Sequence, residues 1–197
     1  MKNHLIVSAV LSLVSLGAMA QSTTAGSVQR DVNQQTRIEQ GLQSGALSTS
    51  EAAKLEKEQS RVDHMQARAL KDGQLSPEEQ AKLKAAQDKA SRDIAAAKHN
   101  TTTGNPNSAS SQRMQADVQR NINQEKRIAS GVQSGALTNH EVSKLERGQS
   151  RVTRKEAVAG ADGHVGAVEQ RRIQKTETRQ SGRILKQKND AQVRDPS

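Results

Sequence analysis

The turn at Asp72–Glu79 is the first segment of this chain whose residue types could do chemistry. Its Asp-Gly-x-Leu-Ser-x-x-Glu pattern has the glycine, apolar residue and glutamate of a calcium-binding EF-hand loop. In that register, however, Arg68 and Leu70 stand where the first two ligands of the loop belong. A calcium ion needs several carboxylate oxygens, and this turn supplies about two. We therefore predict a helix-capping turn here and no calcium site.

Histidine and cysteine, the usual ligands of transition metals, give no metal motif. Beyond residue 20 the histidines are His64, His99, His140 and His164, and none has a second His or Cys three or four residues away. A site between helices from His140 or His164 and carboxylates is the alternative, which the spacing does not support. The carboxylates alternate with Lys and Arg, as solvated helix faces do. We predict no metal, no cofactor and no catalytic residue, because Cys, a Gly-x-Ser-x-Gly motif and a phosphate-binding loop are all absent.

A basic stripe on the last predicted helix is the one feature that suggests a function. Five basic residues fall within about a quarter of the helix circumference, and these candidate anion-binding residues are Arg172, Lys175, Arg179, Arg183 and Lys186. The stripe is either a solvated face or an anion-binding surface whose attraction weakens with salt. The chain has no aromatic residue. Because base stacking uses aromatic side chains, we predict no sequence-specific nucleic-acid binding.

These residues lie in a chain that repeats itself. Residues 28–100 align without a gap on residues 118–190, with about 40% identity. The positions kept in both copies are turn, cap and seam residue types, which indicates a conserved fold. The copies differ in charge: residues 21–100 hold 12 basic and 11 acidic residues, and residues 101–197 hold 17 and 10.

Each copy is predicted to form about three amphipathic helices. In the first copy the apolar seams are Val28, Val32, Ile38 and Leu42, then Leu55, Val62 and Ala69, then Leu83, Ala86, Ala90 and Ile94. Gly45 is suited to a left-handed helix end, and Ser48 with Glu51 forms a capping box. Ser76, Pro77 and Glu79 repeat this start signal, whereas Gly166 replaces the hydroxyl cap in the second copy.

The predicted fold class is therefore all-α, with two tandem repeats of about three amphipathic helices joined by a flexible linker. The Leu55-Val62-Ala69 heptad suits an antiparallel, coiled-coil neighbour. The expected segments are a signal peptide at 1–20, disorder at 21–27, repeat 1 at 28–98, a flexible linker at 99–116, repeat 2 at 117–188 and a disordered tail at 189–197.

The N-terminus predicts export from the cytoplasm. Lys2, an apolar run from Leu5 to Leu16 and small residues before Gln21 are typical of a signal peptide cleaved after Ala20. The run is shorter than the roughly 20 residues of a membrane-spanning helix, so we expect no membrane span. We predict a periplasmic or secreted protein.

Two resemblances agree with this location. The segment Arg37–Glu56 reads R-I-x-x-G-L-x-S-G-x-L-S-x-x-E-A-x-x-L-E, and its copy is Arg127–Glu146. It resembles small secreted proteobacterial proteins of no established activity, which implies a periplasmic helical protein and assigns no site residues. Leu75–Gln80 is similar, more weakly, to the Leu-Thr-x-x-Gln motif of Spy-type periplasmic chaperones, with Glu79 in place of the motif glutamine. Such chaperones are helical and are not enzymes.

Three functions follow as hypotheses. The leading one is a non-enzymatic helical binding or scaffold protein with an unknown protein partner. The second is a binder of anionic surfaces or polymers through the basic last helix, for example lipopolysaccharide, acidic lipid, polysaccharide or extracellular DNA. The third is an envelope-stress, chaperone-like protein. The oligomeric state is left open.

Overall fold

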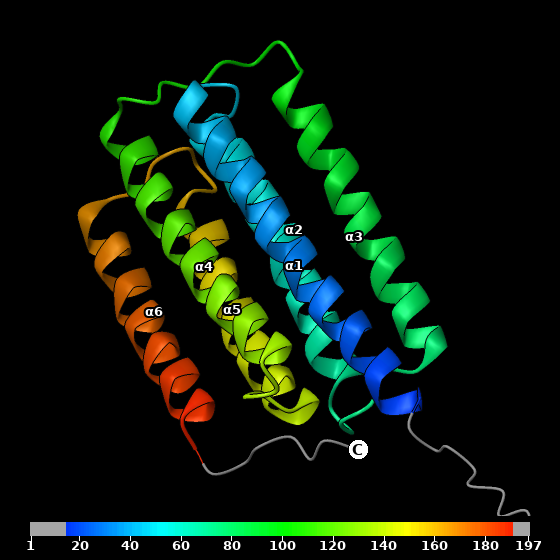
Figure 1. Cartoon of the computed structure of the whole chain (residues 1–197). Coiled ribbons are helices and arrows are strands. Elements are labelled where there is room, and N and C mark those ends of the chain that lie inside the picture. Colours follow the sequence, from blue (N-terminus) through cyan, green and yellow to red (C-terminus); the bar gives the residue numbers. More distant parts are fainter. Residues whose placement is uncertain (1–14, 191–197) are drawn as a thin grey trace, which may run out of the picture.

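The computed structural model describes the backbone of residues 15–190 and the side chains from residue 23. These residues form six α-helices and no strand, which confirms the all-α prediction (Figure 1). The helices are α1 (Ser15–Ser44), α2 (Thr49–Ala69), α3 (Pro77–Lys98), α4 (Ala109–Gln133), α5 (Asn139–Ala159) and α6 (Ala167–Lys188). Most of the predicted signal peptide and of the predicted tail lies outside the described residues. In the described part, no helix has the length and apolar character to cross a bilayer.

Local capping signals fix where the helices begin and end. The Ser48 hydroxyl accepts from the Glu51 N–H while the Glu51 carboxylate accepts from the Ser48 N–H, and Ser76 with Glu79 does the same. Gly45 has a φ of 76°, a left-handed conformation that L side chains rarely adopt. Before α6, Gly166 offers no hydroxyl, but its N–H still donates to the Glu169 carboxylate at 2.8 Å. These boundaries are as the sequence predicted.

The structure differs from the sequence predictions at two polar segments. Residues 21–27, expected to be disordered, continue α1, where the Thr24 side chain is fully buried. Residues 109–116 of the expected linker belong to α4. The loop before them is tied to the first half, because Gly104 donates its N–H to the Gly45 carbonyl at 2.7 Å and Asn100 donates to Glu51. Packing against the bundle and these hydrogen bonds therefore order two polar segments whose own sequences predict no regular structure.

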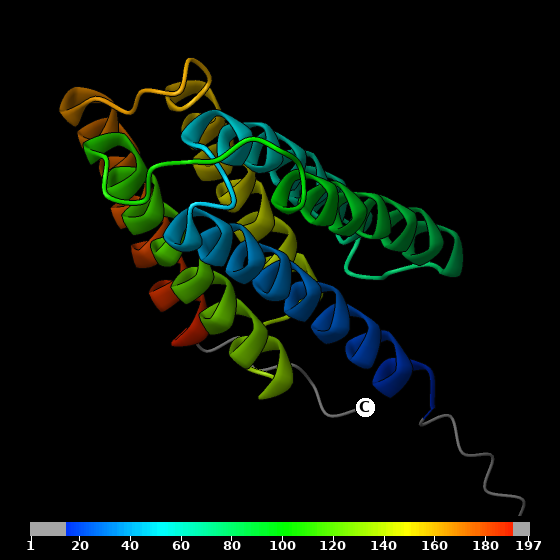
Figure 2. The ribbon, with the colours of Figure 1, turned by 90° about the horizontal axis from the view of Figure 1, so that it is seen from above.

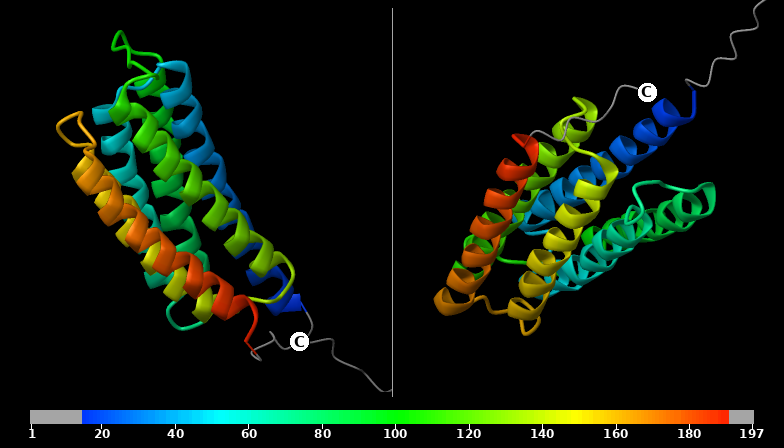
Figure 3. Two further views of the ribbon diagram at one scale, coloured as in Figure 1. Left: turned by 90° about the vertical axis from the view of Figure 1, so that its left-hand side faces the viewer. Right: turned by 90° about the horizontal axis from the view of Figure 1, so that it is seen from below.

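Helices α1, α2, α4 and α5 form the centre of the molecule, and α3 and α6 cover opposite sides of it (Figures 1 and 2). The two most extensive interfaces join helices from different halves of the chain, α2 with α5 and α1 with α4. Asn139 at the start of α5 donates to the Gly73 carbonyl just beyond α2, and Gly160 after α5 lies next to Thr49 at the start of α2. Helices α2 and α5 are therefore antiparallel (Figure 3).

Ser60 and Ser150 mark the centre of this arrangement. Each hydroxyl donates to the other residue's carbonyl oxygen at 2.8 Å, and the two positions are 90 residues apart. A reciprocal pair of this kind lies on an approximate twofold axis that relates the two halves. The same offset relates α2 to α5 and α3 to α6, which have equal lengths pairwise.

The apolar core lies in three clusters. The two larger ones, toward the ends of the bundle, are shared between the halves, and the smallest, of Val62, Leu83 and Ala90, belongs to the first half. One of the larger clusters combines Val28 of α1 with Ile128 and Val132 of α4. The other combines Ile38 of α1 with Met114 of α4 and further residues of both halves. Because the two larger clusters need side chains from both halves, the two halves pack as one unit.

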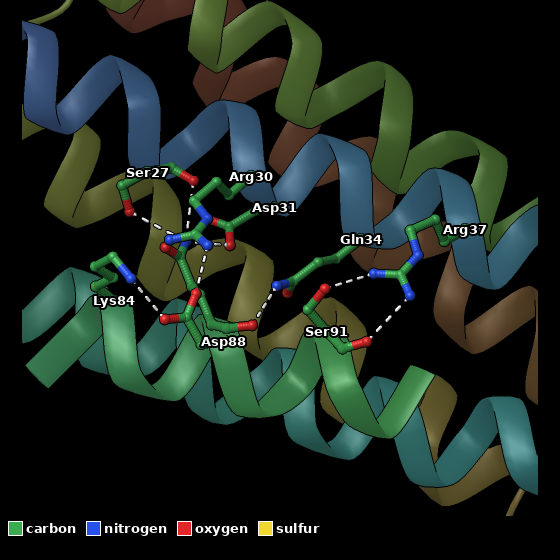
Figure 4. A network of polar contacts seen from close by, with 9 residues as sticks. Ser27, Arg30, Asp31, Gln34, Arg37, Lys84, Asp88 and Ser91 are labelled. Carbon is green, nitrogen blue, oxygen red and sulfur yellow. Dashed lines mark hydrogen bonds and ion pairs between the residues drawn. The ribbon is translucent and has the colours of Figure 1, made fainter. Parts of the chain in front are cut away.

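Polar contacts attach the outer helices to this centre. Figure 4 shows Arg37 of α1 donating to the hydroxyl and the carbonyl of Ser91 on α3, at 2.6 and 3.0 Å. At the corresponding positions of the second half, Arg127 donates to the Ser181 carbonyl at 2.8 Å. The two outer helices are therefore attached by the same device.

The close fit at Gly41 leads to a prediction. A Cβ at Gly41 would lie 2.5 Å from Leu47 Cδ1, and Gly131 is related in the same way to Leu137. Alanine normally stabilises a helix by up to about 1 kcal/mol relative to glycine. Here the collision with a fully buried leucine outweighs that stabilising effect. We therefore expect Gly41→Ala to lower the free energy of unfolding by roughly 1–3 kcal/mol in urea denaturation.

The matched control is Gly182→Ala in α6, where a Cβ would meet nothing within 4 Å. This change should be neutral or stabilising by up to about 1 kcal/mol. If both substitutions stabilise the protein, the contact between Gly41 and Leu47 does not constrain the turn.

Candidate functional site

The basic stripe lies on the exposed face of α6. All five predicted residues are exposed, and three of them, Arg172, Arg179 and Arg183, line a groove between α5 and α6. Lys175 and Lys186 are exposed but do not line this groove. The basic stripe on α6 therefore forms one wall of this groove and was predicted from the sequence. The other wall is seen only in the structure.

That other wall is the exposed face of α5, with Arg151, Arg154 and Lys155. The groove has a volume of about 550 Å³. Gly148 allows the two helices to approach, because a Cβ there would lie 1.9 Å from the buried Gln180 side chain. Six basic side chains therefore line one groove, which follows residues 148–159 of α5 and residues 169–183 of α6.

The groove has one acidic lining residue, and that residue also caps the start of α6. Glu169 lines the groove, but its carboxylate accepts from the Gly166 N–H at the start of α6. Lys155 donates to the Thr176 hydroxyl at 2.6 Å across the groove. The positive charges of the lining are therefore not cancelled locally.

A second hollow, of about 840 Å³, lies between α2 and α5 and has no acidic lining residue. It shares Arg154 and Val158 with the groove and adds Lys54, Lys57 and Arg61 from α2. We call the combined set the basic surface. It comprises Lys54, Lys57, Arg61, Arg151, Arg154, Lys155, Arg172, Arg179 and Arg183, all exposed.

The α2 and α5 part of the basic surface was missed from the sequence. The spacing of Lys54, Lys57 and Arg61 places them on one helix face, which was the available signal. Nothing in the sequence showed that the antiparallel packing of α2 on α5 would bring this face next to Arg151 and Arg154. Two basic faces 90 residues apart in the chain thereby become one surface.

The first half shows how similar cations are neutralised. Lys89 of α3 pairs with Glu58 of α2 at 2.7 Å and also with Asp93. In the second half Arg179 corresponds to Lys89, Gly148 to Glu58 and Arg183 to Asp93. The cation at position 179 therefore has neither acidic partner, because glycine replaces one and arginine replaces the other. Among the described residues, no member of the basic surface forms an ion pair with a carboxylate.

The second polar feature corrects the expectation that the carboxylates face solvent. Among the buried carboxyl side chains of the described residues, eight are at most 2% exposed and have a pKa that burial raises. These are Asp31, Glu56, Asp63, Asp117, Glu125, Glu146, Glu156 and Glu177. They became interior groups because the two halves pack on each other through polar as well as apolar faces.

Some of these carboxyl groups have evident partners. Gln35 donates to Glu56 at 3.0 Å, and Asn121 donates to Glu156 at 2.7 Å. Burial, the first cause, and the charge of Glu56 next to it raise the pKa of Glu156 well above its ordinary value. These two glutamates therefore lie close together, and each accepts a hydrogen bond from one side-chain amide.

Burial raises the pKa of Glu177 to about 8, although Arg120 lies 3.4 Å away and opposes the shift. The sequence signal for such positions was their place in the helical seam. Glu56 and Asp63 are seven residues apart and directly follow the seam residues Leu55 and Val62. A seam position argues for burial in spite of the charge.

The histidines lie elsewhere. His140 Nδ1 is 3.1 Å from the Lys71 carbonyl oxygen, and His164 Nδ1 is 3.1 Å from the Ser110 hydroxyl. Neither belongs to the one described group of side chains close enough to share a metal ion, which is Asp31, Asp63 and Glu146. Comparison of the chain with protein-family models, with curated proteins and with solved structures gives no match.

Proposed function

We propose that this protein is a non-enzymatic, exported helical protein that binds linear anionic polymers on the basic surface. The observation that carries the proposal is the set of nine exposed cations around two adjoining hollows, none paired with a carboxylate of the described chain. An acidic polysaccharide is the polymer class that fits best. Its repeated anionic groups can follow an elongated groove, whereas a flat lipid surface contacts a concave lining less well.

The arginine content supports this choice. Five of the six cations of the groove are arginines, Arg151, Arg154, Arg172, Arg179 and Arg183, and the guanidinium group binds carboxylate or sulfate oxygens in a bidentate manner. The absence of aromatic residues argues against base stacking as the mode of recognition. The binding is therefore electrostatic and should weaken as salt rises.

We further propose that the two halves are tandem repeats that diverged in surface charge after a duplication. The constant offset of 90 residues and the reciprocal contact of Ser60 with Ser150 support this origin. The first half kept acidic partners for its outer cations, and the second half exchanged Glu58 and Asp93 for glycine and arginine. The exported location rests on the N-terminal signal sequence.

The test uses two matched double variants of the full mature chain. Arg172→Gln with Arg179→Gln removes two groove cations, and Lys82→Gln with Lys89→Gln removes the corresponding cations of α3, which are paired with carboxylates. With heparin as the probe, we expect the first variant to raise the Kd at least about tenfold at low salt. The second should change it less than about twofold.

Titration calorimetry at two salt concentrations measures both effects. The wild-type affinity should fall steeply with salt, and the Arg172 and Arg179 variant should show a shallower slope. Equal losses in the two variants, or heparin affinity that does not respond to salt, would contradict the proposal. Circular dichroism checks that both variants remain helical.

A further inference from the structure

Four of the buried carboxyl groups meet near the centre of the bundle, one from each central helix. They are Asp31 of α1, Asp63 of α2, Glu125 of α4 and Glu146 of α5, and we call them the four-carboxyl cluster. One oxygen from each of Asp31, Asp63 and Glu146 lies within 4.8 Å of the others. Glu125 adjoins them, since its charge acts on both Asp63 and Glu146.

The cluster lies between the two apolar ends of the core. On α1, Asp31 lies between Val28 of one apolar cluster and Ile38 of the other, and on α4 Glu125 lies between Ile122 and Ile128. The most exposed of the four side chains is only 2% exposed. At that depth the four side chains are removed from bulk solvent.

Several oxygens of the cluster have no hydrogen-bond partner. Gln87 donates to Asp31 Oδ1 at 2.8 Å, and Thr153 donates to Asp63 Oδ2 at 3.1 Å. Within the described residues, both oxygens of Glu146 and one oxygen each of Asp31 and Glu125 are fully buried without a donor. A buried carboxylate oxygen without a donor is costly, so a cation bound among these oxygens would stabilise the charged cluster.

A neutral side chain beside the cluster, Gln149, also lacks hydrogen-bond partners among the described residues. Gln149 is fully buried and lies beside Glu125: burial, the first cause, raises the pKa of that carboxyl, and the Gln149 side chain opposes the shift. Neither its amide nitrogen nor its amide oxygen reaches a partner with hydrogen-bond geometry among the described residues. An unsatisfied amide therefore adjoins the unsatisfied carboxyl oxygens.

The corresponding place in the other half provides an internal comparison. Ninety residues away, Asp31, Asp63 and Glu125 correspond to Asn121, Thr153 and Gln35, and only Glu146 keeps a carboxyl, as Glu56. There the amides act as donors: Gln35 binds Glu56, and Asn121 binds Glu156. The fold thus accepts neutral residues at three of these four positions, so the fold alone does not require the four acidic ones.

We propose that the four-carboxyl cluster is a binding site for one hard divalent cation of the Mn²⁺ or Ca²⁺ type. Carboxylate-only donor sets favour Ca²⁺, Mg²⁺ and Mn²⁺ over metals that select imidazole or thiolate. Mg²⁺ retains several waters, and a site enclosed by four helices has little room for them. The positive ion replaces the protons that the clustered acids otherwise need at neutral pH.

The experiment measures Mn²⁺ binding to the full mature chain at pH 8 by electron paramagnetic resonance and thermal denaturation. We expect about one Mn²⁺ per chain and a rise of several degrees in Tm on adding Mn²⁺ or Ca²⁺. Glu146→Gln and Asp31→Asn should each weaken Mn²⁺ binding by about a hundredfold or more. Glu56→Gln, at the position that corresponds to Glu146, should leave the binding within about threefold.

Failure to fold does not obscure the result, because Asp31→Asn introduces the residue that already stands at position 121. Its Tm without metal at pH 8 should equal or exceed that of the wild type, while its response to Mn²⁺ is lost. Folded wild-type protein that binds no Mn²⁺ or Ca²⁺ at millimolar concentration overturns the proposal. Equal loss of binding in Glu146→Gln and Glu56→Gln also overturns it.

Discussion

Raising the pH from 5 to 8 in a chelating buffer should lower the Tm of this protein by about 10 °C. Burial raises the pKa of Asp31, Glu56 and Asp117 to about 7 and that of Glu125 and Glu177 to about 8. In the unfolded chain such groups titrate near pH 4. The folded protein therefore binds more protons than the unfolded chain between these limits.

The sign follows from this difference in bound protons. The stability contributed by the protonated carboxyl groups is complete below about pH 4 and is lost as pH rises toward 7 and 8. A net loss of about 4 kcal/mol, the linkage effect of roughly one such group, corresponds to about 10 °C for a chain of this size. Surface pairs such as Arg30 with Asp88 act in the opposite direction, since the pKa of Asp88 is lowered.

Differential scanning calorimetry from pH 4 to 8 checks the prediction. Glu156→Gln provides a control, because glutamine stands at the corresponding position 66 of the first half. This variant should be more stable than the wild type at pH 8 and should have a shallower pH dependence. A Tm that is constant or rises over this range would show that the carboxyl groups are not buried as described.

Ile38→Ala should lower the free energy of unfolding of the whole chain by about 2–5 kcal/mol, the usual cost of such a cavity in a core. Ile38 is fully buried and belongs to the cluster that includes Met114, Val118 and Ile122 of the second half. Since that cluster draws on both halves, the loss should extend to helices that Ile38 does not belong to. Urea denaturation should show one transition shifted as a unit.

Hydrogen exchange distinguishes this result from independent repeats. The slowest amides of α5 should lose protection by the same free energy as those of α1. If the halves were separate units on a flexible linker, α5 would keep its protection and the denaturation curve would show two steps. Leu185→Ala, at a side chain that is 60% exposed, should change stability by no more than about 0.5 kcal/mol.

The sequence by itself determined the helices and their ends. Ser48 with Glu51, Ser76 with Glu79 and the left-handed Gly45 act within a few residues of themselves. A capping hydrogen bond needs no distant partner, so its residue pattern predicts its geometry. The seam residues followed for the same reason, since helical periodicity defines which side chains share a face.

The exposed basic stripe on α6 was likewise visible in the sequence, because five cations on one helix face need no tertiary information to be aligned. The groove required more. Arg151 and Arg154 face Arg172 and Arg179 only because α5 and α6 approach each other at Gly148. A pairing of helix faces is a property of two surfaces, and neither helix specifies it alone.

A place beside the helical seam was the sequence signal for buried acidic residues, and the tertiary structure decided which of them are interior. Asp31 directly precedes the seam residue Val32 and Glu146 directly follows Leu145, but only the packing of α1 on α4 and of α2 on α5 removes both from water. The pattern of charges along one helix does not show which of its faces another helix will cover. Burial of a carboxyl group and the resulting shift in its pKa depend on surfaces that lie about 90 residues apart and meet only in the folded bundle.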